Sequence, residues 1–244
     1  KIIKIDDKEF YKINNKYIKM HSGGSAEKVF NSNVVIDKWF KPEIEQLLGK
    51  SRKPNSKIKQ SHMDIARAVQ THFEKISLEC IKKLSKLVDT KNLCLSGGCA
   101  LNGLLAGKIA KNTKFKNIYI PPASSDDGLS VGAAFYLWNN ILNNKRTSPM
   151  KHAYWGPEYN NDQILKIIMK NKLSYKLINN NNEICKRVSK LIANGSVIGW
   201  FQGREELGQR ALGNRSILAN PAIKSMKNIV NTKIKKRESF RPFA

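Results

Sequence analysis

Hydrophobic residues recur with helical spacing over residues 61–87. The stripe steps by three or four residues each time and consists of Ile65, Val69, Phe73, Ile76, Cys80, Leu84 and Leu87. This spacing predicts one long amphipathic helix, because such a stripe keeps to one side of a helix of 3.6 residues per turn. Ser61, with Asp64 three residues later, predicts a capping box at its start.

Two strand-turn-helix units follow the long helix. The hydrophobic run 93–96 predicts a buried strand, and a glycine turn leads from it into a helix over 100–111. A second strand, 117–120, ends at two prolines and continues through the polar turn 124–128 into another helix. This alternation of strands and helices predicts an α/β fold.

The remaining pattern suggests a second domain. Lys, Arg, Ser and Pro gather at 143–149, which we interpret as a linker between domains 1–145 and 146–244. The first 60 residues predict loops, a hairpin-like start and a short helix. Beyond the linker we expect helices at 164–169, 184–192 and about 223–236, and a strand at 196–201.

Composition limits the class of protein. The 244 residues are 41% hydrophobic and 26% charged, which is the balance of a folded globular chain, and no apolar run reaches the length of a membrane span. The four cysteines form no CxxC pair, so we expect free, buried thiols in a reducing compartment and a cytoplasmic protein. Neither a zinc site nor a disulfide framework is indicated.

The net charge of +25 makes nucleic acid the first polyanion to consider. Lysines, however, are spread along the whole chain without a dense basic block, which favours a solvated surface over a nucleic-acid interface. The arginines are clustered, because five of the nine fall within 204–241, at Arg204, Arg210, Arg215, Arg237 and Arg241. A planar guanidinium binds phosphate or carboxylate in a bidentate manner, so the cluster indicates an anion site. The alternative is that some of these arginines only pair with Glu205, Glu206 and Glu238.

Two turns at strand ends carry further candidate chemistry. Ser96-Gly97-Gly98 leads from a strand into a helix, where free backbone N–H groups favour a phosphate, although an ordinary tight turn has the same sequence. Asp126 and Asp127 precede Gly128 after the next strand. They could hold a metal through oxygen ligands or serve as a helix N-cap.

Together these motifs resemble the O-carbamoyltransferases of the nodulation-factor and antibiotic-tailoring type. Four ordered segments of this length are not expected to match by chance, and the resemblance covers most of the chain. The segments are 93–102, 122–134, 199–218 and 231–244.

The resemblance implies an actin-like (ASKHA-type) ATP-binding domain, of which 1–145 is the C-terminal part, followed by a separate α/β carbamoyltransferase domain at 146–244. It implies that carbamoyl phosphate gives its carbamoyl group to ATP, as carbamoyladenylate, and then to a hydroxyl of a sugar or natural-product acceptor. It is compatible with a homodimer, and it favours neither a membrane nor a nucleic acid as a partner. The related enzymes that make threonylcarbamoyladenosine on transfer RNA are one alternative, and a basic nucleic-acid-binding protein is another.

The resemblance also assigns residues to roles. The carbamoyl phosphate site would use Arg204, Arg210, Asn214, Arg215 and Arg241, with Lys235 as a weaker candidate. The nucleotide site would use Ser96, Gly97, Gly98, Asn102 and Gly128. Asp126 would be the carboxylate ligand of a divalent metal, iron by resemblance, whose histidine ligands lie in a family segment that precedes this chain.

Three departures from the family pattern bear on this assignment. Gln209 replaces a usual proline, Asn220 a usual aspartate and Ala222 a usual arginine, so one anion contact is expected to be lost or supplied elsewhere. None of the four histidines lies in a matching motif. The chain starts without methionine and stops within Arg-Pro-Phe-Ala, so we interpret it as an internal fragment that is inactive by itself.

Overall fold

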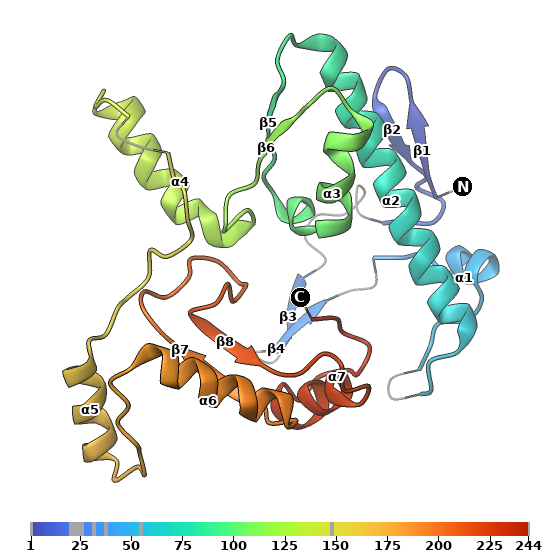
Figure 1. The fold of residues 1–244 in the computed structure, drawn as a ribbon. Helices are drawn as coiled ribbons and strands as arrows, with labels where there is room; N and C mark the ends of the chain where they lie inside the picture. The colour runs from blue at the N-terminus through green and yellow to red at the C-terminus, as the bar shows by residue number, and fades with distance from the viewer. Residues whose placement is uncertain are drawn as a thin grey trace. The chain divides into compact units, whose positions relative to one another are not determined.

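The computed structural model describes residues 2–19, 39–53, 56–146 and 149–243, together with the backbone of two strands at 27–30 and 33–36. The chain separates into two units, Lys1–Ile120 and Pro121–Ala244, and each is described by itself (Figure 1). This division precedes the linker at 143–149, and the two-domain boundary at 145 stays a prediction.

The first unit contains most of the strands. Its elements are β1 (Ile3–Asp6), β2 (Phe10–Ile13), β3 (Glu27–Phe30), β4 (Asn33–Ile36), α1 (Glu43–Leu48), α2 (Gln60–Leu87), β5 (Asn92–Cys94), the 3-10 helix η1 (Gly98–Leu101), α3 (Gly103–Asn112) and β6 (Asn117–Tyr119). The strand pairs β1–β2 and β3–β4 are antiparallel, whereas β5 and β6 are parallel. Parallel strands need a crossover, and α3 provides it. The predicted hairpin-like start and strand-helix-strand order are therefore confirmed.

The core of the first unit lies where α2 meets this crossover. Ile81 of α2, Leu93 of β5, Ile109 of α3 and the nearby Phe115 form one buried cluster. Because Ile109 and Phe115 are 0% and 1% exposed, the hydrophobic effect acts most strongly here. The long helix is confirmed, but Lys59 rather than Ser61 is its N-cap residue, since the Lys59 backbone N–H donates to His62 Nδ1 at 3.0 Å.

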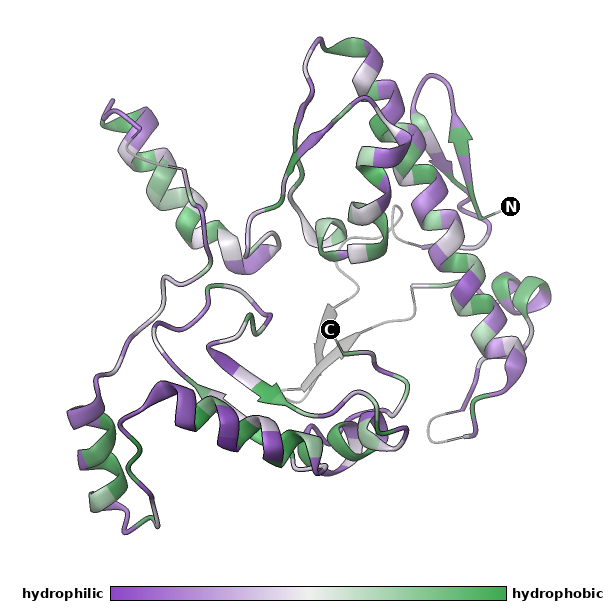
Figure 2. Cartoon of the chain, in the orientation of Figure 1, coloured by the Kyte–Doolittle hydropathy of each residue, from purple (hydrophilic) through white to green (hydrophobic). Residues whose placement is uncertain are grey.

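The buried face of α2 differs from the predicted stripe. Val69 and Leu87 of that stripe are 61% and 73% exposed, whereas Glu74 and Ile81 are buried. Figure 1 shows α2 between α3 and the β1–β2 hairpin, and Figure 2 shows hydrophobic and hydrophilic bands alternating along it. A helix with neighbours on two sides has no single hydrophobic face, which explains the difference.

Helices form most of the regular secondary structure described in the second unit. Its elements are η2 (Asp126–Gly128), α4 (Leu129–Tyr136), the π-helical η3 (Leu137–Ile141), α5 (Asn161–Lys170), α6 (Asn181–Ala193), β7 (Ile198–Phe201), β8 (Arg215–Leu218), α7 (Met226–Ile229) and the π-helical η4 (Val230–Ile234). β7 and β8 pair antiparallel, with Phe201 opposite Arg215. Its buried hydrophobic residues are Ala123, Ala153, Met226 and Val230.

The architecture is mixed α/β, as predicted from the alternation of elements, and the actin-like assignment stays a prediction. All four cysteines are free, as expected, but the expectation of burial is wrong because Cys94, Cys99 and Cys185 are exposed. None of the helices among the described residues combines the length and the apolar character that crossing a membrane requires.

Candidate functional site

The glycine turn after β5 is exposed and has backbone geometry that favours glycine. Gly97 has φ +92°, in the left-handed region that side chains with a Cβ rarely adopt. Ser96, Gly97 and Gly98 are all exposed. The turn leads into the short 3-10 helix η1 rather than directly into α3, so the expected helix start at residue 100 is wrong, and a separate cap residue begins α3.

That cap residue is Asn102, which the resemblance assigns to the nucleotide site. Its Oδ1 accepts from the Leu105 backbone N–H at 3.1 Å. Its amide also pairs with Gln70 of α2, accepting at 3.1 Å and donating at 3.0 Å. Gln70 donates in turn to Glu74 Oε1 at 2.7 Å, and Lys108 pairs with the other oxygen of Glu74. The structure thus places the Asn102 side chain in a network that joins α2 to α3.

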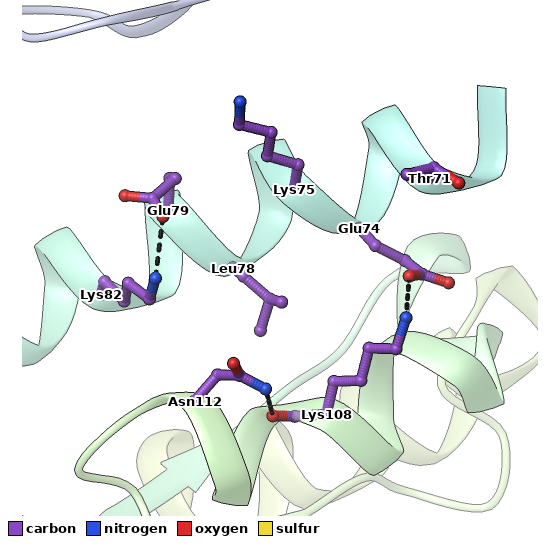
Figure 3. Close-up of a pocket in the computed structure, with 8 residues that line it drawn as sticks. All are labelled: Thr71, Glu74, Lys75, Leu78, Glu79, Lys82, Lys108 and Asn112. Carbon is purple, nitrogen blue, oxygen red and sulfur yellow. Dashed lines mark hydrogen bonds and ion pairs between the residues drawn. The ribbon is translucent and has the colours of Figure 1, made fainter. Parts of the chain in front are cut away.

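A surface hollow of about 420 Å³ lies between α2 and α3 beside this network (Figure 3). Two of its lysines already have carboxylate partners within the hollow, because Lys108 pairs with Glu74, and Lys82 Nζ lies 2.9 Å from Glu79 Oε1. Its lining is Thr71, Glu74, Lys75, Leu78, Glu79, Lys82, Lys108 and Asn112. None of the residues assigned to the nucleotide lines this hollow, and most of its charges compensate one another.

Replacing Asn102 with alanine is expected to destabilise the protein by about 1–2 kcal/mol, because the helix loses its cap and Gln70 loses its amide partner. Asn112→Ala is the matched control, since that exposed side chain makes one bond to the Lys108 carbonyl near the end of the same helix. Urea unfolding followed by circular dichroism measures both variants. Equal unfolding midpoints would contradict the capping role.

The acidic turn of the second unit is organised by a glycine. A Cβ at Gly128 would lie 2.0 Å from the Ala123 carbonyl oxygen, so the backbone approaches too closely for any other residue. Asp126 and Asp127 are exposed, and neither η2 nor α4 has a side-chain cap bond, so the N-cap interpretation is not supported. Among the residues that the structure describes, no three His, Cys, Asp or Glu side chains gather as metal ligands. The described residues therefore do not form a complete metal site, and the assignment of Asp126 as a metal ligand stays a prediction.

The arginine-rich segment is the loop that connects β7 to β8, which we call the arginine loop (residues 202–214). Its first part pairs with 153–157, since Gly156 N–H donates to the Glu205 carbonyl at 2.9 Å and Glu205 N–H donates to the Pro157 carbonyl at 3.0 Å. Gly208, with φ +100°, approaches Pro122 so closely that a Cβ would lie 2.6 Å from the Pro122 carbonyl oxygen. The arginine loop therefore contacts the segment that leads to the acidic turn.

Glu206 is the centre of the arginine loop. Its side chain is buried, and Oε1 accepts the backbone N–H groups of Leu212, Asn214 and Arg215 at 2.8, 2.7 and 3.2 Å. Burial by itself raises the pKa of this carboxyl, but the backbone donors outweigh burial and lower the pKa to about 2. Glu206 is therefore ionised at neutral pH.

Four of the assigned anion-binding residues lie in or beside this loop, and the side-chain hydrogen bonds of three of them, Arg204, Asn214 and Arg215, are made within it or to the segment 153–157. The Arg215 guanidinium donates to the Gln202 carbonyl at 2.8 Å and stacks on Phe201, with 3.6 Å from Cζ to the ring centroid. Arg204 Nε donates to the Gly156 carbonyl at 3.1 Å, and Asn214 Nδ2 donates to the Arg204 carbonyl at 2.7 Å. The structure brings Arg204, Asn214 and Arg215 together in one hydrogen-bonded loop.

The C-terminal tail, residues 235–243, forms a second network around Asn231. This asparagine is 0% exposed, donates to the Ser239 and Arg241 carbonyls at 3.2 and 2.9 Å, and accepts from Arg237 Nε at 2.7 Å. Arg241 Nε pairs with Glu238 Oε2 at 2.8 Å. The glutamate-pairing interpretation is thus correct for Arg241, whereas Glu206 binds backbone amides instead.

The two remaining candidates are exposed. Arg210 lies in the arginine loop between Gly208 and Leu212, and Lys235 follows η4 at the start of the tail.

Sequence reasoning missed the organising roles of Glu206, Asn231 and Gln70, the three polar residues on which these networks depend. The pair of acidic residues among the glycines and arginines of 203–216 was the available signal for Glu206.

Comparison with known proteins identifies the family. Residues 4–135 match the family described as Carbamoyltransferase N-terminus, and residues 189–244 match Carbamoyltransferase C-terminus. An uncharacterised protein of Synechocystis sp. is 40% identical over 199 residues, which are 79% of this chain and 32% of that protein. Nodulation protein NolO of Bradyrhizobium diazoefficiens is 37% identical over 185 residues, 76% of this chain and 34% of that protein. The chain thus spans about a third of the length of these relatives, and it belongs to the carbamoyltransferase family.

Proposed function

We propose that the protein containing this chain is an ATP-dependent O-carbamoyltransferase that takes its carbamoyl group from carbamoyl phosphate. The observation that carries this proposal is the arginine loop, which contains Arg204, Arg210 and the amide of Asn214 and is followed directly by Arg215 of β8. Fixed guanidinium and amide donors stabilise phosphate anions and the charge that develops when phosphate leaves. Family membership supports the choice of a carbamoyl donor.

The proposed reaction has three steps, and the atoms balance in each. Water cleaves carbamoyl phosphate to carbamate and phosphate, and the carbamate oxygen then attacks the α-phosphorus of ATP, so that pyrophosphate leaves and carbamoyladenylate forms. The acceptor hydroxyl attacks the carbamoyl carbon, loses its proton and displaces AMP. The arginine loop would bind the first phosphate, and Arg241 and Lys235 of the tail would add positive charge.

The glycine turn Ser96-Gly97-Gly98 is proposed to face the nucleotide, because exposed backbone N–H groups without large side chains let phosphates approach closely. The Asn102 side chain is engaged in the Gln70 and Leu105 bonds, so a direct role at the nucleotide would require those bonds to be exchanged. Gly128 contributes by the close backbone approach that shapes the acidic turn.

A divalent metal, iron by resemblance, would draw one ligand from Asp126 and its other ligands from outside the described residues. The described residues do not form its complete site, and no step is assigned to it. Both proposed substrates are intracellular metabolites, so we propose that the reaction takes place in the cytoplasm. The acceptor is proposed only as a compound that carries a hydroxyl group.

The test is pyrophosphate release from ATP by the full-length, metal-replete protein. We expect release that depends on carbamoyl phosphate and needs no acceptor, because the adenylate forms before the acceptor reacts. Omitting carbamoyl phosphate is the control. If the rate is the same with and without carbamoyl phosphate, the proposed function is wrong.

A further inference from the structure

Glu206 is a buried carboxylate in the arginine loop, and it binds backbone amides rather than arginine side chains. It is 8% exposed and directs one oxygen at three backbone N–H groups. Those groups belong to Leu212, Asn214 and Arg215. A buried carboxylate without such donors would be costly, so the loop and the carboxylate depend on each other.

The positions of these amides show which parts of the loop backbone Glu206 holds. The bond to Leu212 closes residues 206–212 into a ring that contains Arg210. The bonds to Asn214 and Arg215 hold the backbone at the point where the loop enters β8. One side chain thereby sets the backbone of three residues assigned to the anion site.

Two other contacts make this arrangement rigid. Gly213, with φ +113°, lets the chain turn between the Leu212 and Asn214 amides, and its N–H donates to Ser216 Oγ at 3.0 Å. Leu207, next to Glu206, donates its N–H to the Ala153 carbonyl at 2.6 Å. The base of the Glu206 side chain and the amides that it binds are therefore both held in place.

We propose that Glu206 is a positioning residue: its carboxylate holds the backbone of the arginine loop in the shape that binds the phosphorylated carbamoyl donor. This inference rests on the proposed function. In this proposal Glu206 itself does not touch the donor, because its side chain is buried and its Oε1 accepts three backbone N–H groups. It acts through Arg210, Asn214 and Arg215.

The experiment compares Glu206→Gln with wild type in the full-length protein, by initial rates of pyrophosphate release. Glutamine keeps an acceptor oxygen but loses the charge, so its bonds to the amides weaken. We expect the KM for carbamoyl phosphate to rise about tenfold, while the KM for ATP stays within about twofold. Loss of folded protein alone would lower kcat and leave both KM values unchanged.

Glu205→Gln is the matched control, because this neighbour is exposed and its hydrogen bonds to Gly156 and Pro157 are made by its backbone. Its KM values are expected to equal those of wild type. Glu206→Asp, which keeps the charge but shortens the reach by one methylene, is the second variant and is expected to raise the same KM. It keeps the proposal testable if Glu206→Gln does not fold.

Hydrogen exchange of the amides at 212, 214 and 215 provides a readout that does not depend on activity. Faster exchange at these amides in Glu206→Gln, but not in Glu205→Gln, is expected. An unchanged KM for carbamoyl phosphate in both Glu206 variants, or equal increases in both KM values, overturns the positioning role. Absence of release by wild type overturns the proposed function instead, and this inference with it, whatever the exchange rates are.

Discussion

Replacing Arg210 with alanine is expected to lower kcat/KM for carbamoyl phosphate about 100-fold or more in the full-length protein, which is about 3 kcal/mol of transition-state stabilisation. Arg210 lies in the ring that Glu206 closes by binding the Leu212 amide. A guanidinium there would neutralise the charge that grows on the leaving phosphate, and alanine provides no donor in its place. Pyrophosphate release at subsaturating carbamoyl phosphate measures the effect.

Two further variants sharpen this prediction. Arg187→Ala removes an exposed arginine from α6, outside the arginine loop, and is expected to leave kcat/KM within about twofold of wild type. Arg210→Lys restores the charge without the planar fork and is expected to recover only part of the activity. Wild-type kinetics in Arg210→Ala would show that this arginine is assigned wrongly.

Replacing Gly128 with alanine is expected to destabilise the protein by about 3 kcal/mol or more, or to displace the acidic turn, because overpacking of this kind costs about 1–3 kcal/mol and sometimes more. The added Cβ would lie 2.0 Å from a backbone oxygen, that of Ala123, which has no flexible side chain to move aside. The backbone angles of Gly128, φ −84° and ψ −8°, suit any residue, so the clash alone causes the loss.

Gly132→Ala is the control for this substitution. Gly132 lies four residues further on, within α4, and a Cβ added there would meet none of the described atoms beyond its own helix backbone within 4 Å. Alanine favours a helix over glycine, so this variant is expected to gain up to about 1 kcal/mol. Denaturant unfolding of both variants checks the pair, and equal loss at the two positions would contradict the clash.

The periodic elements can be predicted because local spacing specifies them. The hydrophobic pattern alone predicts the strand at 117–120 and the helix at 184–192, and β6 and α6 lie there. Asn194 and Gly195 follow α6, a pair that is typical of a helix C-terminus, and Gly195 has φ +90°. Such elements depend on residues that are close in sequence.

The buried face of α2 cannot be predicted in the same way. It includes Glu74, which is 7% exposed because Gln70 and Lys108 bind its carboxylate. A charged residue in a helix is ordinarily taken as solvent-exposed, and its burial here is favourable because Gln70 of α2 and Lys108 of α3 both bind it. The hydrophobic stripe therefore identifies the helix but not the face that it buries.

The residue types of the sequence point to the segment that forms the candidate site, but they do not predict which contacts its side chains make. Clustering of arginine identifies the segment 204–215, and the structure brings Arg204 and Arg215 into one hydrogen-bonded loop. The acidic residues among the glycines and arginines mark the position of Glu206, but its role depends on backbone amides that any sequence would provide, so residue type does not reveal what its carboxylate binds. The pairing of Arg241 with Glu238 is one of two alternatives that the sequence leaves open.

The Asn231 network has a consequence for how the tail responds to ionic strength. Asn231 is uncharged and buried, so dissolved ions cannot screen its bonds to the Ser239 and Arg241 carbonyls. The exposed pair of Arg241 with Glu238 weakens as salt is added. In concentrated salt the tail is therefore expected to keep its backbone path while the ion pair between the Arg241 guanidinium and the Glu238 carboxylate weakens.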